Sequence, residues 1–185
     1  MRVIDVAYSG KVISVVRSYE SERPSAYFEM VRHPGSAAIV AVTDEGKLLL
    51  VNQYREAIGQ YVLEIPAGKL EAGEAPETCA SRELEEETGH RARSIEKLCE
   101  FFVTPGYSDE KIRIFSALGL ERTKSNLEED EVLSLVEVDL ADALTMIDDG
   151  RIEDAKTIAG ILEFTRKKKW SLSSRGTGKR QTEGK

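Results

Sequence analysis

Short runs rich in β-branched and aromatic residues alternate with turn signals over the first two-thirds of the chain, which is typical of strands joined by short connections. Seven runs predict strands, at residues 12–20, 26–33, 37–43, 47–54, 95–103, 111–120 and 132–138. Between the third and fourth runs, Asp44, Glu45 and Gly46 predict a hairpin connection in which Gly46 adopts a positive φ.

Three segments carry helical signals, at about residues 76–89, 140–149 and 154–169. Pro76 suits the first turn of a helix, Gly150 stops the second segment, and Asp154 can cap the third. Because helices and strands are interspersed, the predicted fold class is α/β or α+β, with helices packed on a sheet. No internal repeat or heptad run is present.

The composition indicates one ordinary globular domain with a sizeable core, since 41% of the 185 residues are hydrophobic and 32% are charged. The formal charge of −7 argues against a protein whose main task is to bind nucleic-acid phosphates or an anionic membrane surface. An anionic small substrate is still compatible with this charge, because bound metal cations reverse the local electrostatics.

Charge is unevenly distributed along the chain. From Arg166 onward there are eight basic residues against the single acid Glu183, so the body is acidic and the end is basic. Residues 171–185 are rich in Ser, Gly and charge and contain one apolar residue, Leu172. Such a segment cannot bury enough surface to offset the entropy cost of ordering, so we expect a basic flexible tail with no specific nucleic-acid partner.

The two cysteines, Cys79 and Cys99, form no CxxC pair and have no zinc-like spacing to His33 or His90. They indicate free thiols in a reducing compartment. The N-terminus lacks an apolar signal region, and no stretch approaches the roughly 18 apolar residues that span a bilayer. We therefore expect a cytoplasmic protein without a membrane partner.

The segment with the clearest chemistry is GKLEAGEAPETCASRELEEETGH, residues 68–90. Glu83, Glu86 and Glu87 project from one side of the predicted helix, where like charges cost roughly 0.2–0.5 kcal/mol per pair. Only Arg82, four residues before Glu86, relieves this repulsion within the segment. A charge run on a helix is usually a solvated face, but clustered carboxylates also suit a hard divalent cation, which prefers oxygen ligands.

This segment resembles the Nudix box, G-x5-E-x7-R-E-U-x-E-E-x-G-U, in which U is aliphatic. Eight of the nine defined positions match: Gly68, Glu74, Arg82, Glu83, Leu84, Glu86, Glu87 and Gly89. The ninth is His90, a departure that bears on packing after the helix rather than on the carboxylates. The resemblance implies a Nudix-like mixed β-sheet sandwich with helices packed on it, plus a small N-terminal antiparallel sheet.

The resemblance also implies a metal centre. Glu83, Glu86 and Glu87 would bind Mg²⁺, with Mn²⁺ as an alternative, and the backbone carbonyl of Ala67 commonly joins such ligands. The expected chemistry is the hydrolysis of the diphosphate of a nucleotide compound.

Four further residues of the box have structural roles by the same resemblance. Arg82 and Glu74 would form the ion pair that positions the loop and helix. Gly68 would allow a close approach of the backbone, and Gly89 would end the helix.

The flanks of the box are similar to those of ADP-ribose pyrophosphatases. In VNQYREAIGQYVLEIPAG, Arg55 would bind phosphate; the alternative is a surface arginine at a strand end. Pro105 lies 16 residues beyond Gly89, where the ADP-ribose branch carries a proline. Glu110 in the same loop would reach the terminal ribose, or it is simply a solvated loop acid.

By composition, the run of residues 128–131 is an acidic loop. In similar enzymes a glutamate of this loop acts as the general base on the attacking water, which suits an enzyme that closes over its substrate. Glu129 is the first candidate and Glu131 the second.

Phe28 and Glu29 occupy the strand with which related enzymes bind adenine, although an aromatic residue in a strand more often belongs to the core. The partner aromatic expected near Val12 is missing, so the selectivity for the base is open.

The resemblance covers about residues 8–165 and implies three regions. These are an N-terminal β-subdomain at 1–35, a Nudix catalytic domain at 36–170 and the basic tail at 171–185. Relatives of this branch are homodimers that share or exchange the N-terminal sheet, so we expect a homodimer.

The favoured activity is Mg²⁺-dependent hydrolysis of ADP-ribose to AMP and ribose 5-phosphate. One alternative keeps the chemistry but changes the substrate to NADH, FAD, a nucleoside-diphosphate sugar or a diadenosine polyphosphate. Another is a sensor that binds ADP-ribose without cleaving it, against which the intact carboxylates of the box argue.

Overall fold

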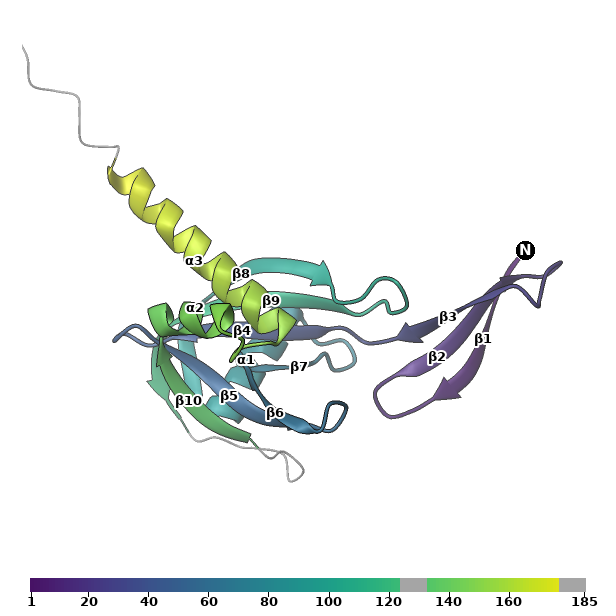
Figure 1. The fold of residues 1–185 in the computed structure, drawn as a ribbon, viewed down its shortest axis with the longest axis horizontal. Helices are drawn as coiled ribbons and strands as arrows, with labels where there is room; N and C mark the ends of the chain where they lie inside the picture. Colours follow the sequence, from purple (N-terminus) through teal and green to yellow (C-terminus); the bar gives the residue numbers. More distant parts are fainter. Residues whose placement is uncertain (124–132, 177–185) are drawn as a thin grey trace, which may run out of the picture.

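A computed structural model describes residues 1–123 and 133–176, with side chains described as far as residue 168. The chain forms two separate β-sheets (Figure 1). The smaller sheet is antiparallel and contains the first three strands, β1 (Arg2–Ser9), β2 (Ser14–Glu20) and β3 (Tyr27–Arg32). It stands away from the body of the molecule.

The larger sheet has seven strands in the order β10-β5-β4-β9-β8, with β6 added beside β5 and β7 beside β4. β4 and β9 pair in parallel, and the other strand pairs described in this sheet are antiparallel. The strands are β4 (Ser36–Val42), β5 (Lys47–Arg55), β6 (Gln60–Glu64), β7 (Ala67–Lys69), β8 (His90–Phe102), β9 (Lys111–Arg122) and β10 (Leu133–Asp139). The sheet is therefore mixed, as the sequence predicts.

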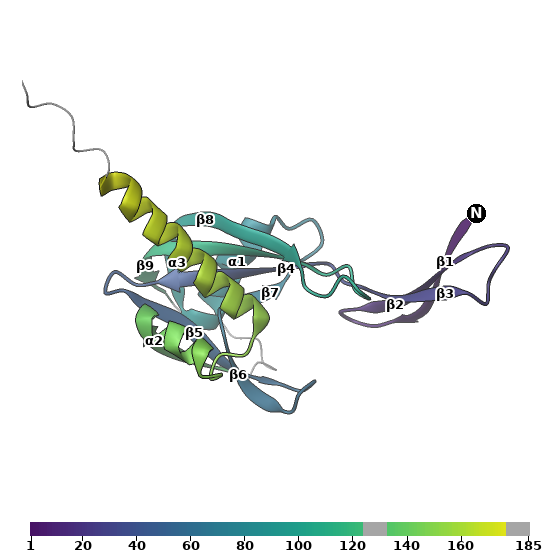
Figure 2. The same cartoon turned by 45° about the horizontal axis from the view of Figure 1, so that its top comes forward.

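Helices cover both faces of the larger sheet: α1 (Pro76–Thr88) on one face, and α2 (Leu140–Asp148) and α3 (Ala155–Gly176) on the other (Figures 1 and 2). The central strand β4 explains this arrangement, because every one of its residues is buried and its side chains alternate between the two faces. Ala37, Ile39 and Ala41 join the core beneath α1. The residues between them, such as Val40, join the core beneath α2 and α3.

The small sheet is tied to the body by the loop before β9. The Val31 N–H donates to the Tyr107 carbonyl at 2.7 Å, and Arg32 pairs with Asp109 at 2.7 Å. The His33 N–H donates to the same Asp109 carboxylate at 2.9 Å. These contacts fix the end of β3 beside the loop that leads into β9.

The first two predicted helices are confirmed to within a residue. Three strands were not predicted: β1, whose apolar side chains are exposed, and β6 and β7, short strands held by pairing with β5 and β4. Strand β8 begins at His90 rather than at residue 95, because the polar start of this strand pairs with the far end of β9.

The third helix continues to Gly176, past the predicted end at residue 169. The helix therefore includes the backbone of residues 171–176, the first part of the predicted tail. Residues 177–185 lie outside the described part of the chain. Within that part, no helix is long and apolar enough to cross a membrane.

Candidate active site

Helix α1 carries most of the box. Pro76 stands at its start, and Gly89 ends it with φ 67° and ψ 32°, its N–H donating to the Glu85 carbonyl at 2.9 Å. The side chain of His90, in the aliphatic position of the box, is buried, and its Nδ1 lies 2.8 Å from the Thr88 carbonyl. Since a carbonyl only accepts, Nδ1 is the donor, and the polar ring is accommodated without disturbing the helix end.

The carboxylates of α1 do not form a plain solvated face. Glu83 and Glu87 are only 7% and 4% exposed, although α1 also buries Cys79, Ala80 and Leu84 against the sheet. Charged side chains are seldom buried to this extent unless they are paired, so the partners of these two carboxylates form part of the candidate site.

Arg82 is the centre of an ionic network with three carboxylates. Its guanidinium donates to both oxygens of Glu74, at 3.0 and 3.2 Å, and Nη1 donates to Glu83 at 2.7 Å and to Glu86 at 2.9 Å. Chiefly through the hydrogen bond to Glu74, these contacts raise the pKa of Arg82 above its ordinary value. The sequence predicts the pair with Glu74 but underestimates how many carboxylates Arg82 neutralises.

The short strand β7 brings backbone against these carboxylates. The Ala67 N–H donates to Glu87 Oε2 at 3.1 Å. At Gly68 an added Cβ would overlap the carboxylate of Glu83, so a larger residue there would displace that carboxylate or the strand. The backbone of Ala67 and Gly68 thus lies directly beside two of the box glutamates.

The donors present fit a divalent metal in their chemistry, since carboxylate and carbonyl oxygens are the ligands of hard cations. Among the residues that the structure describes, however, no group of three acidic, histidine or cysteine side chains is gathered for a metal ion. The convergence expected from sequence is absent because Arg82 bridges Glu83 and Glu86, while Glu87 accepts from Ala67. Metal ligation by these residues stays a prediction.

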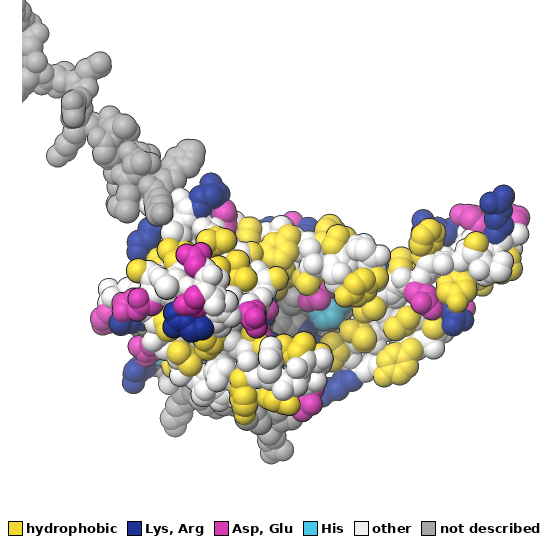
Figure 3. Space-filling view, in the orientation of Figure 1, with side chains coloured by type: hydrophobic (Ala, Val, Ile, Leu, Met, Phe, Trp, Pro, Cys, Tyr) yellow, Lys and Arg dark blue, Asp and Glu magenta, His cyan; other side chains and the backbone are white. Residues whose placement is uncertain are grey.

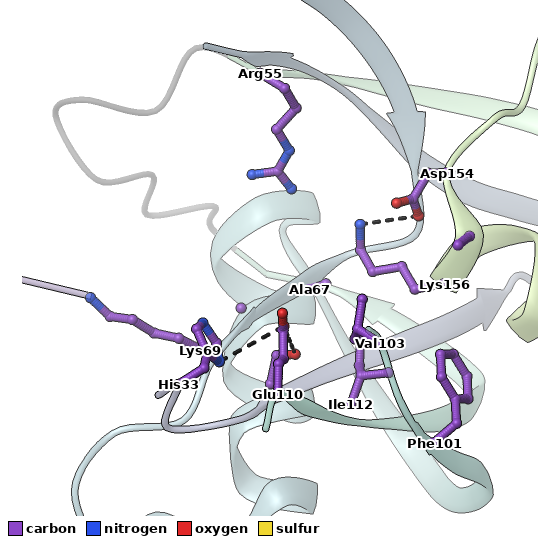
Figure 4. Close-up of a pocket in the computed structure, with 13 residues that line it drawn as sticks. His33, Arg55, Ala67, Lys69, Phe101, Val103, Glu110, Ile112, Asp154 and Lys156 are labelled. Atoms are coloured by element: carbon purple, nitrogen blue, oxygen red, sulfur yellow. Dashed lines mark hydrogen bonds and ion pairs between the residues drawn. The ribbon is translucent and has the colours of Figure 1, made fainter. Parts of the chain in front are cut away.

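A cavity of about 310 Å³ opens beside the box (Figure 4). Its lining includes Arg55, Ala67, Glu110 and Lys156. A neighbouring cleft of about 400 Å³ shares Arg55, Ala67, Gly68 and Lys69 with this cavity and adds Lys11, Arg82, Glu83 and Glu86. Two of the box carboxylates, Glu83 and Glu86, therefore line the same cleft as Arg55, and residues of β7 line both spaces.

Arg55 is held in place rather than loose at a strand end. Its Nε and Nη2 donate to the two oxygens of Glu64 at 2.7 and 2.6 Å. Burial alone would raise the pKa of Glu64, but the contacts with Arg55 and Lys156 outweigh it and lower that pKa. Sequence reasoning gave no role to Glu64 or Lys156, because their meeting depends on the fold.

The other predicted substrate residues divide between two cavities. Glu110 lines the cavity of Arg55 and accepts a hydrogen bond from Ser36 Oγ at 3.0 Å. Phe28, Glu29 and Pro105 line another cavity, of about 410 Å³, that shares no lining residue with the first. Phe28 is 72% exposed, which excludes the core interpretation of this aromatic side chain.

The two candidate bases, Glu129 and Glu131, lie outside the described residues. The residues on either side of this gap contact the end of the box and the strand β5. The Thr123 N–H donates to the Gly89 carbonyl at 2.7 Å, and Leu133 pairs with Gln53, which lines the cleft beside the box.

Gly68→Ala is expected to lower kcat/KM for the diphosphate substrate at least tenfold. The added Cβ overlaps the Glu83 carboxylate, so either that side chain or the β7 backbone must move. Steady-state kinetics with a thermal melt test this. In Gly46→Ala, the added Cβ meets open space but a φ of +83°, so this control should lower the melting temperature and spare activity. Unchanged kinetics in Gly68→Ala would contradict the importance of this contact.

Known proteins resemble this chain both in sequence and in fold. Residues 32–161 match the model of the NUDIX domain. The chain is 45% identical to an ADP-ribose pyrophosphatase of Bacillus subtilis and 42% identical to a methanol dehydrogenase activator of Bacillus methanolicus; each match covers 83% of this chain and 85% of the relative. The crystal structure of an ADP compounds hydrolase has the same fold, with a TM-score of 0.71 at 21% identity over 96% of this chain and 95% of the other. The chain belongs to the Nudix family.

Proposed function

We propose that this Nudix hydrolase cleaves ADP-ribose to AMP and ribose 5-phosphate with Mg²⁺ as its metal and Mn²⁺ as an alternative. The observation that carries the proposal is a single cleft lined by Arg55 together with Arg82, Glu83 and Glu86. A fixed guanidinium in the same cleft as carboxylates suits a diphosphate bound together with a divalent metal. The 45% identity to an ADP-ribose pyrophosphatase supports the choice of substrate.

Members of the Nudix family generally require a divalent metal. In this chain Glu83, Glu86, Glu87 and the Ala67 carbonyl would hold it, after Arg82 gives up its contacts with Glu83 and Glu86. When bound, the metal supplies charge neutralisation at the diphosphate and acidifies water.

The chain's own residues supply binding, orientation and proton transfer. Arg55, held by Glu64, binds and orients the diphosphate through its remaining N–H groups. Glu129, or Glu131 as the second candidate, takes the proton of the attacking water. Glu110, in the same cavity as Arg55, binds the terminal ribose.

We assign Phe28, Glu29 and Pro105 to the adenine end of the substrate within a homodimer. Their cavity is separate from that of Arg55, so a second copy must bring the two kinds of site together. Support comes from apolar side chains gathered along the N-terminal sheet (Figure 3). Ile4, Val6 and Tyr8 on β1 are more than half exposed, an apolar surface of the kind that a partner chain covers.

The division into residues 1–35, 36–170 and 171–185 remains part of this proposal, as does a cytoplasmic location. The boundary near residue 35 is supported by the break between the two sheets. The location is supported by Cys79 and Cys99, which are both free thiols.

A substrate panel with Mg²⁺ tests the proposed function. ADP-ribose should exceed NADH, FAD, GDP-mannose, UDP-glucose and diadenosine polyphosphates in kcat/KM by tenfold or more, which is about 1.4 kcal/mol of differential transition-state binding. Equal rates for an ADP-sugar and its GDP counterpart would reduce the activity to that of a general sugar-nucleotide pyrophosphatase. Tight binding of ADP-ribose without hydrolysis of any compound would instead favour the sensor.

A further inference from the structure

A buried carboxylate joins two cations at the wall of the Arg55 cavity. Glu64, the last residue of β6, is only 3% exposed. It accepts two hydrogen bonds from Arg55 at the end of β5 and also contacts the ammonium of Lys156 at the start of α3. The strands β5 and β6 and the helix α3 thus meet at one charged cluster.

Lys156 is fixed from a second side. Its Nζ lies 3.1 Å from Asp154 Oδ2, and the Asp154 carboxylate in turn accepts from the N–H and the hydroxyl of Thr157, at 2.9 and 2.6 Å. The Thr157 hydroxyl accepts from the Ile65 N–H at 2.9 Å, which ties α3 to the residue that follows Glu64. The lysine is therefore held by interactions at both ends of the cluster.

Neither cation has used all its donors in these contacts. An ammonium has three N–H groups, and Lys156 directs contacts to two carboxylates. A guanidinium has five, and Arg55 gives two to Glu64. Both side chains line the same cavity (Figure 4), and Lys156 keeps 15% of its side chain exposed there. The lining also contains Ala67 and Gly68, whose backbone lies beside the box carboxylates Glu87 and Glu83.

Stability alone is a poor explanation for such a cluster. A buried ion pair is often no more stabilising than apolar side chains of the same size, because removing charges from water costs as much as their attraction returns. Fixed cations with spare donors on a cavity wall are instead suited to an anion with several oxygens, such as a diphosphate.

We propose that Lys156 is a second cationic contact to the diphosphate of the substrate, alongside Arg55, and that Glu64 is the positioning residue for both. The inference rests on the proposed function for the identity of the whole substrate, but the contact concerns only the diphosphate. Inorganic pyrophosphate is therefore the probe that separates the two.

The test compares Lys156→Met and Lys156→Arg with the wild type. Lys167→Met is the matched control, since Lys167 is on the same helix and also donates to two oxygens, the carbonyls of Lys97 and Leu98, but lines no described cavity of the site. Calorimetry with pyrophosphate in EDTA measures binding. Kinetics with ADP-ribose and Mg²⁺ measure kcat and KM, and thermal melts measure folding.

Lys156→Met should bind pyrophosphate at least tenfold more weakly, which is about 1.4 kcal/mol, and should raise KM more than it lowers kcat. Lys156→Arg should stay within about threefold of the wild type, because it keeps the charge, and Lys167→Met should match the wild type. If Lys156 had only a structural role, its loss would not raise KM more than it lowers kcat, and arginine would not restore pyrophosphate binding.

Three results would overturn the inference: wild-type pyrophosphate affinity in Lys156→Met, an equal loss in Lys156→Arg with a lowered melting temperature, or no pyrophosphate binding by the wild type. If the wild type does not hydrolyse ADP-ribose but pyrophosphate binding follows the expected order, the proposed function fails and the diphosphate contact stands.

Discussion

Glu87→Gln is expected to lower kcat by two orders of magnitude or more while changing the melting temperature little. Glu87 is nearly buried, and its carboxylate accepts the Ala67 N–H. An amide oxygen can accept that same hydrogen bond, so the local structure should persist. What the substitution removes is the negative charge that a divalent metal requires among its ligands.

The same argument predicts that EDTA abolishes activity and that Mg²⁺ or Mn²⁺ restores it. In a titration of activity with Mg²⁺, Glu87→Gln and Glu83→Gln should need a higher Mg²⁺ concentration than the wild type for half-maximal activity. Glu77→Gln is the matched control, because Glu77 is in the first turn of the same helix and is exposed. Full activity of Glu87→Gln at every metal concentration would remove Glu87 from the ligand set.

Glu129→Gln should lower kcat by about 10²–10⁴, the usual range for the loss of a general base, and leave KM largely intact. The described acids of the Arg55 cavity already have partners: Glu110 accepts from Ser36, and Asp154 pairs with Lys156 and Thr157. The acidic run ends just before Leu133, which pairs with Gln53 at the cleft. This closeness along the chain is the reason that we expect the base to come from this run.

Glu131→Gln is the comparison that identifies the base. If it alone shows the large effect, the base is two residues further along the chain. If both variants keep the wild-type kcat in single-turnover measurements, proton abstraction belongs to another residue.

The parts of the fold that local chemistry determines could be predicted from sequence. Pro76 and Gly89 set the ends of α1, and their effects depend on residues within one turn. The short strands β6 and β7 could not be predicted in this way, because their existence depends on pairing with β5 and β4. Strand β1 carries the same signal as the predicted strands, in Val3, Ile4, Val6 and Tyr8, so the sequence was sufficient to predict it.

The site shows the same limit. The box spacing predicts that Arg82 pairs with Glu74, and both lie together in the structure. It cannot predict that Glu64 joins Arg55 to Lys156, because 92 residues separate Glu64 from Lys156 along the chain. Nor can spacing show that Phe28 lines a different cavity from Arg55, since the placement of the N-terminal sheet decides this.

The double burial of β4 constrains how this gene can change in length. Each of residues 37–42 joins one of two cores, so inserting or deleting one residue would send every later side chain of the strand to the opposite core. The same slip would shift the pairing of Ala38 with Ala67 and displace the backbone beside the box glutamates. Descendants that gain or lose a codon should therefore survive when the change falls in a turn such as 44–46, and be eliminated by selection when it falls within 36–42.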